Sequence, residues 1–300
     1  MELVTIITPT YNRSTTLERC WQSLQKQNNK NFQWLVIDDG STDETQELMA
    51  VLKKQTIDFE ISYQIKPNGG KHTALNFAHP YIKGEVVLIL DSDDFLTTDA
   101  INTVLQEWKK IEYKPEIGGI TFMRSSDGIT ALAKMPEESI LSDHIHFRIN
   151  QHINGDCCET LRASIFKEYV FPEIAGEVFL GEGMLWTTTS LSYRTLYLDK
   201  IVYIAPEYRS DGLSQAGRKM RLKNLQGALL NCELHMNKKI IFSFRLKKAI
   251  LKICYSFFLH KRIKEIINTT QYKILIIISI PAGYLLYLYW HKKYGVDEKC

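Results

Sequence analysis

The sequence predicts an α/β fold, a mostly parallel sheet flanked by helices, followed by a C-terminal helical tail. Short apolar runs alternate with amphipathic stretches through the first half of the chain, and three of those runs end in polar residues. Strands that are apolar throughout are buried on both faces, as they are in parallel sheets covered by helices. The tail is predicted by residues 238–293, which are rich in both basic and apolar side chains.

Hydrophobic periodicity places the individual elements along the chain. In the first half, strands are predicted at residues 4–7, 34–37, 59–65, 85–90 and 118–123, and helices at residues 17–24, 48–52, 71–78 and 99–110. The second half is less regular. Its predicted elements are a hairpin or loop at residues 125–139, helices at residues 165–169, 181–193 and 218–237, and a strand at residues 195–204.

Composition and charge narrow the class of protein. The apolar fraction of 45% and the charged fraction of 24% are those of a globular protein rather than a disordered one. A net charge of +3 is too small to indicate nucleic acid, so no nucleic-acid partner is expected. The six cysteines show no disulfide framework or zinc spacing, and the N-terminus does not have the order of a signal peptide. The body of the protein is therefore expected to be cytoplasmic.

The polar strand ends are the first candidate site, because ligands of parallel sheets bind beyond the carboxyl ends of the strands. Asp91-Ser92-Asp93-Asp94 follows the most apolar strand. Clustered carboxylates there favour a divalent cation, Mn²⁺ or Mg²⁺, that grips phosphate oxygens and stabilises a departing diphosphate. The alternative is a set of surface acids near the start of the next helix.

Other strand ends suggest a nucleotide. The acidic pair Asp38-Asp39 could accept a hydrogen bond from a base or a ribose, and Ser41 or Thr42 could cap the helix that follows. Tyr11 could stack on a base and Arg13 could meet a base carbonyl or a phosphate, although both could equally be loop packing. The glycine turn before Lys71 feeds a helix N-terminus, which attracts anions.

These segments together carry a family resemblance. Pro9-Thr10-Tyr11-Asn12-Arg13, Asp38-Asp39-Gly40-Ser41-Thr42-Asp43, Asn68-Gly69-Gly70-Lys71 and Asp91-Ser92-Asp93-Asp94 stand in the order and spacing of the family-2 glycosyltransferases. The chain resembles that family closely over residues 3–125 and more loosely to residue 235. The resemblance implies a GT-A fold, an inverting mechanism, a nucleotide-diphosphate sugar donor, most often a UDP-sugar, and Mn²⁺ or Mg²⁺ as cofactor.

The resemblance also implies roles for single residues. It assigns to Asp39 the contact with the base of the nucleotide. It also makes Asp93, together with Asp91, the metal ligand. Donor-binding positions implied in this way are Thr8, Pro9, Tyr11, Arg13, Asp39, Gly70, Lys71, Asn76, Asp91 and Ser92.

An inverting transfer needs a general base to deprotonate the acceptor hydroxyl. Relatives often show Glu-Asp near a Trp in the second half, and the best match here is Glu182, with Gly183 where many relatives have Asp. Glu177 and Asp156 are the reserves, and Glu182 could instead be only a helix N-terminal acid. Residues 209–214 resemble a later loop of such enzymes, and their glycine and polar content suits a mobile lid.

The tail predicts association with a membrane surface. Residues 274–290 are almost uncharged and include aromatic side chains expected at a lipid headgroup boundary, and residues 242–267 mix basic with apolar side chains as interfacial helices do. Interfacial attachment at the inner face is the favoured interpretation. A true membrane span, or a buried helix or dimer contact, is the alternative.

The sequence therefore predicts a catalytic domain at residues 1–235, with a nucleotide half at residues 1–125 and an acceptor half at residues 126–235. The tail covers residues 236–300. The acceptor is expected to be a glycan or a lipid-linked glycan. Two other functions stay open: a nucleotidyltransferase, which would usually show an N-terminal glycine-rich phosphate loop that this chain lacks, and a non-catalytic sugar-nucleotide-binding scaffold.

Overall fold

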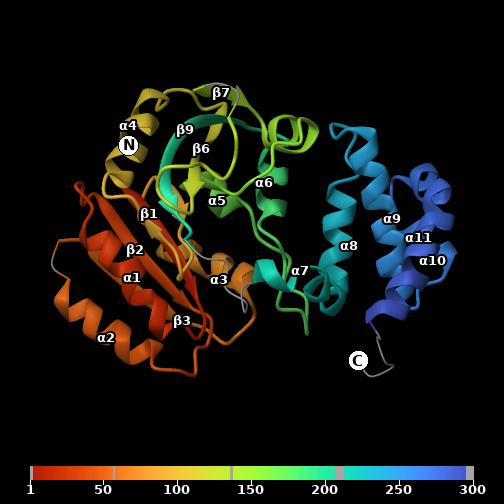
Figure 1. Cartoon of the computed structure of the whole chain (residues 1–300), viewed down its shortest axis with the longest axis horizontal. Helices are drawn as coiled ribbons and strands as arrows, with labels where there is room; N and C mark the ends of the chain where they lie inside the picture. Colours follow the sequence, from red (N-terminus) through yellow and green to blue (C-terminus); the bar gives the residue numbers. More distant parts are fainter. Residues whose placement is uncertain (1–2, 57, 136–137, 207–212, 295–300) are drawn as a thin grey trace.

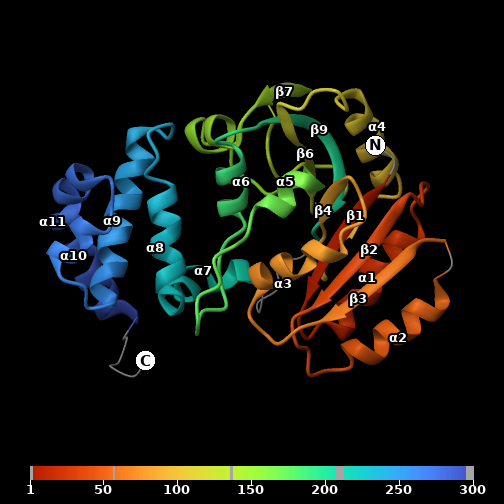
Figure 2. The same ribbon diagram turned by 180° about the vertical axis from the view of Figure 1, so that it is seen from behind.

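The computed structural model describes residues 3–56, 58–135, 138–206 and 213–294. The predicted lid at residues 209–214 lies mostly outside the described residues. Within these residues a nine-stranded sheet forms the body of the protein, and helices α9 (Phe242–Phe258), α10 (Ile263–Asn268) and α11 (Lys273–Tyr294) form the tail. The tail lies at the opposite end of the molecule from α1 (Ser14–Gln25) and α2 (Thr45–Gln55) (Figures 1 and 2).

The first part of the sheet is parallel, as predicted. Its strands are β1 (Val4–Thr10), β2 (Phe32–Asp38), β3 (Glu60–Ile65) and β4 (Val86–Ile89), in the order β3-β2-β1-β4. Helices cover both faces because successive strand residues point to opposite sides. Ile6 packs in the core under α1, α2 and α4 (Ala100–Lys110), and Ile7 packs in the core under α3 (Lys71–Ala78), α5 (Ala163–Glu168) and α6 (Gly183–Thr189).

The rest of the sheet is mixed, which adds antiparallel strands to the mostly parallel sheet that the sequence predicts. Strand β8 (Cys157–Arg162) lies between β4 and β6 (Ile117–Ser125) and runs antiparallel to both. Strand β9 (Arg194–Ile204) is parallel to β6, whereas β5 (Phe95–Leu96) and β7 (Ser139–Ser142) are antiparallel to β9. Strands β5, β7 and β8 were not predicted, because short strands give too little periodicity and strand direction depends on long-range pairing.

The helix predicted at residues 218–237 is two helices, α7 (Leu213–Lys223) and α8 (Leu225–Leu234). Asn224 interrupts the run with non-helical backbone angles, φ −130° and ψ 63°. Its side-chain Oδ1 accepts hydrogen bonds from the backbone N–H groups of Val178 and Phe179, at 2.8 and 3.0 Å. The break therefore ties α8 to the segment that precedes α6.

In the tail, α11 packs along α9 through one face and leaves the other exposed. Gly283 faces α9 so closely that an added Cβ would lie 2.6 Å from Cβ of Ile253. By length and composition, α11 is apolar enough to cross a membrane. The exposed apolar side chains of α11 are Ile274, Ile277, Ile278, Tyr284, Leu285, Leu288 and Tyr289.

The close approach at Gly283 makes a stability prediction. We expect Gly283→Val to lower the free energy of unfolding by about 1–3 kcal/mol, because the new side chain would collide with Ile253. Urea unfolding followed by tryptophan fluorescence measures this change. The matched control is Ala282→Val, at an exposed position one residue earlier, which is expected to change little. Equal effects of both substitutions would contradict the packing described here.

Candidate active site

The site begins where the parallel strands end. Thr10, the last residue of β1, pairs with Asp38, the last residue of β2. The Asp39 N–H donates to the Thr10 carbonyl at 2.8 Å, and Asp91 follows β4 at the same edge of the sheet. The three polar segments that the sequence singled out therefore meet at one edge.

The loops after β1 and β2 are joined to each other. The Asn12 N–H donates to Ser41 Oγ at 2.9 Å, and Asn12 Oδ1 accepts from the Thr42 N–H at 2.8 Å. Neither Ser41 nor Thr42 caps α2, which corrects that prediction: Asp43 Oδ1 accepts from the N–H of Thr45, the first residue of the helix, at 3.1 Å. The Tyr11 ring beside this junction is 46% exposed and is open to a stacking partner.

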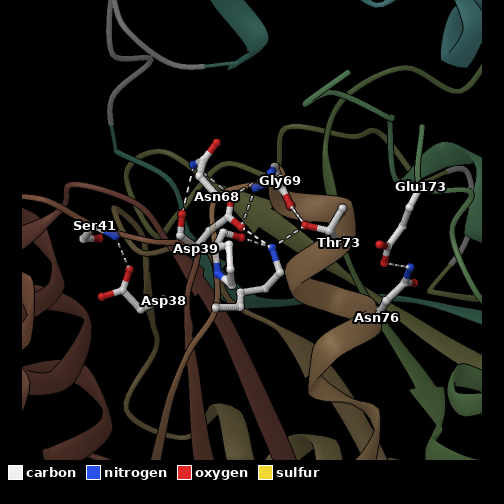
Figure 3. A network of polar contacts seen from close by, with 11 residues as sticks. Asp38, Asp39, Ser41, Asn68, Gly69, Thr73, Asn76 and Glu173 are labelled. Atoms are coloured by element: carbon white, nitrogen blue, oxygen red, sulfur yellow. Dashed lines mark hydrogen bonds and ion pairs between the residues drawn. The ribbon is translucent and has the colours of Figure 1, made fainter. Parts of the chain in front are cut away.

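Asp39 holds the glycine turn in place (Figure 3). Its Oδ1 accepts from Lys66 Nζ at 2.6 Å and from the Gly69 N–H at 3.0 Å. Its Oδ2 accepts from the Gly70 N–H at 2.6 Å and from Asn68 Nδ2 at 3.2 Å. Both carboxylate oxygens are thus used within the protein, so a base N–H at Asp39 would have to share them.

Gly70 must be glycine for two reasons. Its φ is +91°, in the region that residues with a Cβ rarely adopt, and an added Cβ would lie 1.9 Å from the Val178 carbonyl oxygen. This contact brings the segment before α6 against the turn. Lys71 starts α3 at this point, and the turn therefore sets where the Lys71 side chain can reach.

Lys71 connects the predicted metal acids to the predicted base. Its ammonium pairs with Asp91 and with Glu182, the N-cap residue of α6. Arg124 Nη1 lies 3.6 Å from the second oxygen of Asp91. Although burial raises the pKa of Asp91, Lys71 and Arg124 lower it to about 2. Burial and the charge of Asp91 raise the pKa of Asp94 to about 7, so the two acids differ in their readiness to ionise.

The metal prediction rests mainly on Asp93. Among the described residues, no group of three or more His, Cys, Asp or Glu side chains is placed to hold a metal on its own. Asp91, predicted as a second ligand, is paired with Lys71 and Arg124. The carboxylate of Asp93 has no hydrogen-bond or ion-pair partner in the described part of the chain. One open carboxylate fits a Mg²⁺ or Mn²⁺ ion that the phosphates of a substrate help to hold.

A cavity of about 430 Å³ opens beside Glu182. Lys71 and Asp91 also line it, so the predicted base and one of the strand-end acids, Asp91, lie around one space. The reserve base Asp156 lines the same cavity. The reserve base Glu177 does not: its carboxylate accepts from the N–H groups of Gln226 and Gly227 at the start of α8, at 2.6 and 2.7 Å.

Some predicted donor-binding residues make contacts within the fold. Asn76 bonds both backbone groups of Phe171, with its Nδ2 donating to the carbonyl at 2.9 Å and its Oδ1 accepting from the N–H at 2.8 Å, and its Nδ2 also reaches Glu173 at 2.8 Å (Figure 3). Thr8 Oγ1 accepts from Trp34 Nε1 inside the core. Asn76 and Thr8 are thus engaged away from the cavity, while Pro9 and Ser92 are buried in the strand ends.

Three site residues were missed from the sequence. Arg124, the guanidinium of which stacks 4.0 Å from the centre of the Tyr203 ring, lies at the carboxyl end of β6. The strand-end rule that found Asp91 applies equally to the predicted strand at residues 118–123, and would have found Arg124. Tyr203 donates to Asp94 and accepts from the Asp91 N–H. Glu159 lines the cavity from β8, a strand that the sequence did not indicate.

Comparison with known proteins follows this geometry. Residues 5–170, more than half of the chain, match the family "Glycosyl transferase family 2". The chain belongs to this family. The resemblance carried by the motifs is thereby confirmed, and with it the reaction class: the protein is a glycosyltransferase.

Similar proteins agree with this assignment. The chain is 26% identical over 317 residues to the GalNAc(5)-diNAcBac-PP-undecaprenol beta-1,3-glucosyltransferase of Campylobacter jejuni, covering 96% of this chain and 93% of that protein. It is 37% identical over 108 residues to the chondroitin synthase of Pasteurella multocida, covering 36% of this chain but only 11% of that enzyme.

Solved structures confirm the GT-A fold. Staphylococcus aureus TarS 1–349 in complex with UDP-GlcNAc superposes with a TM-score of 0.59 at 16% identity, over 99% of this chain and 93% of that one. The mannosyltransferase PcManGT from Pyrobaculum calidifontis, in complex with GDP-Man and Mn²⁺, gives a TM-score of 0.60 at 14% identity, over 98% and 88% of the two chains.

The hydrogen bonds from the glycine turn and Lys66 to the Asp39 carboxylate, here called the clamp, lead to a prediction about nucleotide binding. We expect Asp39→Asn to weaken UDP binding by about tenfold or more, because an amide nitrogen cannot accept from the turn N–H groups and Lys66 loses its ion pair. Isothermal titration calorimetry measures this affinity. Asp58→Asn, at an exposed acid, is the control and should leave it unchanged. UDP binding that survives Asp39→Asn intact would show that the clamp does not organise the donor site.

Proposed function

We propose that this protein is an inverting glycosyltransferase that moves a sugar from a UDP-sugar to a hydroxyl group of a lipid-linked glycan. The observation that carries the proposal is the pairing of Lys71 with both Asp91 and Glu182, beside one cavity. A single displacement needs a base on the acceptor side and positive charge on the leaving-group side. Glu182 supplies the first, and Lys71 and Arg124 supply the second.

The proposed step is direct. The acceptor hydroxyl attacks the anomeric carbon of the donor sugar, its proton passes to the Glu182 carboxylate, and the bond from the anomeric carbon to the diphosphate breaks. Lys71 holds Glu182 in position through their ion pair. A Mn²⁺ or Mg²⁺ ion bound through Asp93 would neutralise charge on the departing diphosphate.

The donor class is supported by fold neighbours and by the site. TarS is described with UDP and UDP-GlcNAc, and PcManGT with GDP-Man and Mn²⁺. In this chain the exposed ring of Tyr11, next to the joined loops after β1 and β2, is a platform for a base. Asp39 sets the adjacent turn, and thereby the position of Lys71.

The acceptor and the location are supported by the tail. The Campylobacter relative, which is named for a PP-undecaprenol-linked acceptor, matches nearly the whole length of this chain, tail included. The exposed apolar face of α11, near Lys273, Lys292 and Lys293 at its ends, suits the boundary between lipid headgroups and acyl chains. We place the enzyme at the inner face of a membrane on this basis, with the catalytic domain at residues 1–235 and the tail at residues 236–300.

The role of Glu182 predicts a kinetic result. We expect Glu182→Gln to lower kcat about 100-fold or more while UDP-sugar binding is retained, because the amide cannot take the acceptor proton. Release of UDP from a panel of UDP-sugars, with Mn²⁺ or with EDTA, measures turnover. Glu177→Gln is the matched control, since that carboxylate caps α8, and should keep near-normal kcat. Equal turnover of Glu182→Gln and wild type would reject Glu182 as the base. If the wild-type protein binds UDP but turns over none of the donors, the scaffold alternative is favoured.

The exposed face of α11 makes a second prediction. We expect the double change Ile277→Asp and Leu285→Asp to weaken binding to phosphatidylglycerol–phosphatidylethanolamine vesicles about tenfold or more, because charged groups resist transfer into the acyl region. Vesicle co-sedimentation measures binding. The control pair Ile129→Asp and Val170→Asp removes exposed apolar side chains from the body of the protein and should have no effect. Unchanged sedimentation of the α11 variant would contradict membrane attachment through this face.

A further inference from the structure

A second cavity adjoins the active-site cavity, at the start of the tail. It has a volume of about 80 Å³ and is bounded by residues of α7, α8 and α9. Phe179, Leu180, Gly181 and Arg221 line both cavities. An added Cβ at Gly181 would meet nothing within 4 Å, so the junction between the two spaces is open. Glu182 is the next residue in the chain, which places the predicted base beside this junction.

The second cavity has a positively charged lining. Its charged lining residues in the described part of the chain are Arg221, which is exposed at its edge, and Lys248, which is half-buried. Lys248 Nζ donates to Asn231 Oδ1 at 2.8 Å and lies 5.3 Å from the centre of the Phe244 ring. Burial, together with the charges of Arg221 and Lys247, lowers the pKa of Lys248 to about 8, although Cys232 opposes this.

A neighbouring lysine shows what Lys248 lacks. Lys252, one turn further along α9, is buried and pairs with Glu233 at 2.5 Å. Buried or partly buried charges are usually paired, because an unpaired one loses hydration without compensation. Among the described residues, the partners of the Lys248 ammonium are a neutral amide and an aromatic ring, and the like charge of Arg221 acts on it. An anionic ligand between the two would supply the missing partner.

We propose that Arg221 and Lys248 bind the phosphate that joins the acceptor glycan to its lipid. This rests on the proposed function and adds the site that recognises the acceptor. A phosphate or diphosphate matches two cations better than a neutral sugar does, because its charged oxygens accept charge-assisted hydrogen bonds. The open space at Gly181 leaves room for a group attached to the phosphate on the side of the first cavity.

The position of the cavity matches the order of groups in such an acceptor. On one side it joins the space beside Glu182, where the accepting hydroxyl must lie. On the other side it is bounded by α9, against which α11 packs with its outer apolar face exposed. Helix α8 stands between α6 and α9 in both views (Figures 1 and 2). The glycan would therefore lie beside Glu182 and the phosphate between Arg221 and Lys248. The lipid would lie along the exposed apolar face of α11.

The donor diphosphate is a poor candidate for this cavity. Its charges are needed next to Asp93, Lys71 and Arg124, where the parallel strands end. None of these residues lines the second cavity. Arg221 lines both cavities, but Lys248 lines the second and not the first, so the pair of cations would bind a different phosphate from the one that leaves in the reaction.

The test uses the full chain and farnesyl diphosphate as a soluble lipid diphosphate, with binding measured by calorimetry. We expect the double variant Arg221→Gln, Lys248→Gln to bind farnesyl diphosphate about tenfold more weakly or worse, because two charge-assisted contacts are lost. Lys248→Met alone is the second variant, with a loss of about fivefold expected. The matched control, Lys223→Gln with Lys247→Gln, removes the same charge from exposed neighbouring positions and should bind normally.

Three outcomes would overturn the proposal. The double variant could bind farnesyl diphosphate as tightly as the wild type does. Inorganic diphosphate could bind as tightly as farnesyl diphosphate, which would indicate a free-phosphate site, or the double variant could lose affinity for phosphatidylglycerol vesicles to the same degree, which would indicate a headgroup site. UDP titrated into the same samples separates this test from the proposed function. Retained UDP binding in the double variant with lost farnesyl diphosphate binding supports the site, whereas wild-type protein that fails to bind UDP would reject the proposed function itself.

Discussion

One ammonium group, that of Lys71, holds the two halves of the active site together. It lies at the start of α3 and pairs with Asp91, which follows β4, and with Glu182, which directly precedes α6. The three residues are far apart in the chain. A partly buried cation between two carboxylates is stable only if both stay in place, because removing one leaves a charge without its partner. The acid edge of the sheet and the proposed base are therefore positioned by one interaction.

The position of Lys71 depends in turn on Asp39. That carboxylate binds two successive backbone N–H groups of the glycine turn, and the turn leads directly into α3. Gly70 then allows the Val178 carbonyl to approach, which brings the segment before α6 within reach of Lys71. Asp39 at the strand end thus positions the glycine turn, and the turn positions Lys71. Lys71 in turn positions Glu182, the proposed general base.

The tail is continuous with this site rather than an appendage to it. Asn224 links the start of α8 to Val178 and Phe179, and the same segment walls both cavities. Helix α9 carries Lys248 into the second cavity and supports α11 through the close contact at Gly283. The proposed transfer site and the proposed lipid-facing surface are therefore built from adjoining helices.

The sequence by itself determined the parallel strands, their polar ends and the motif residues from Tyr11 to Asp93, because apolar runs and strand-end residues are local properties of the chain. It also determined the family, through the spacing of those motifs. The tertiary structure decided the rest. The antiparallel insertion of β8, the break at Asn224, the structural use of Asn76 and the arrival of Arg124 beside Asp91 all depend on partners distant in sequence. Hydrogen-bond and ion-pair partners across the fold leave no periodic trace in the chain, so only the folded arrangement could reveal them.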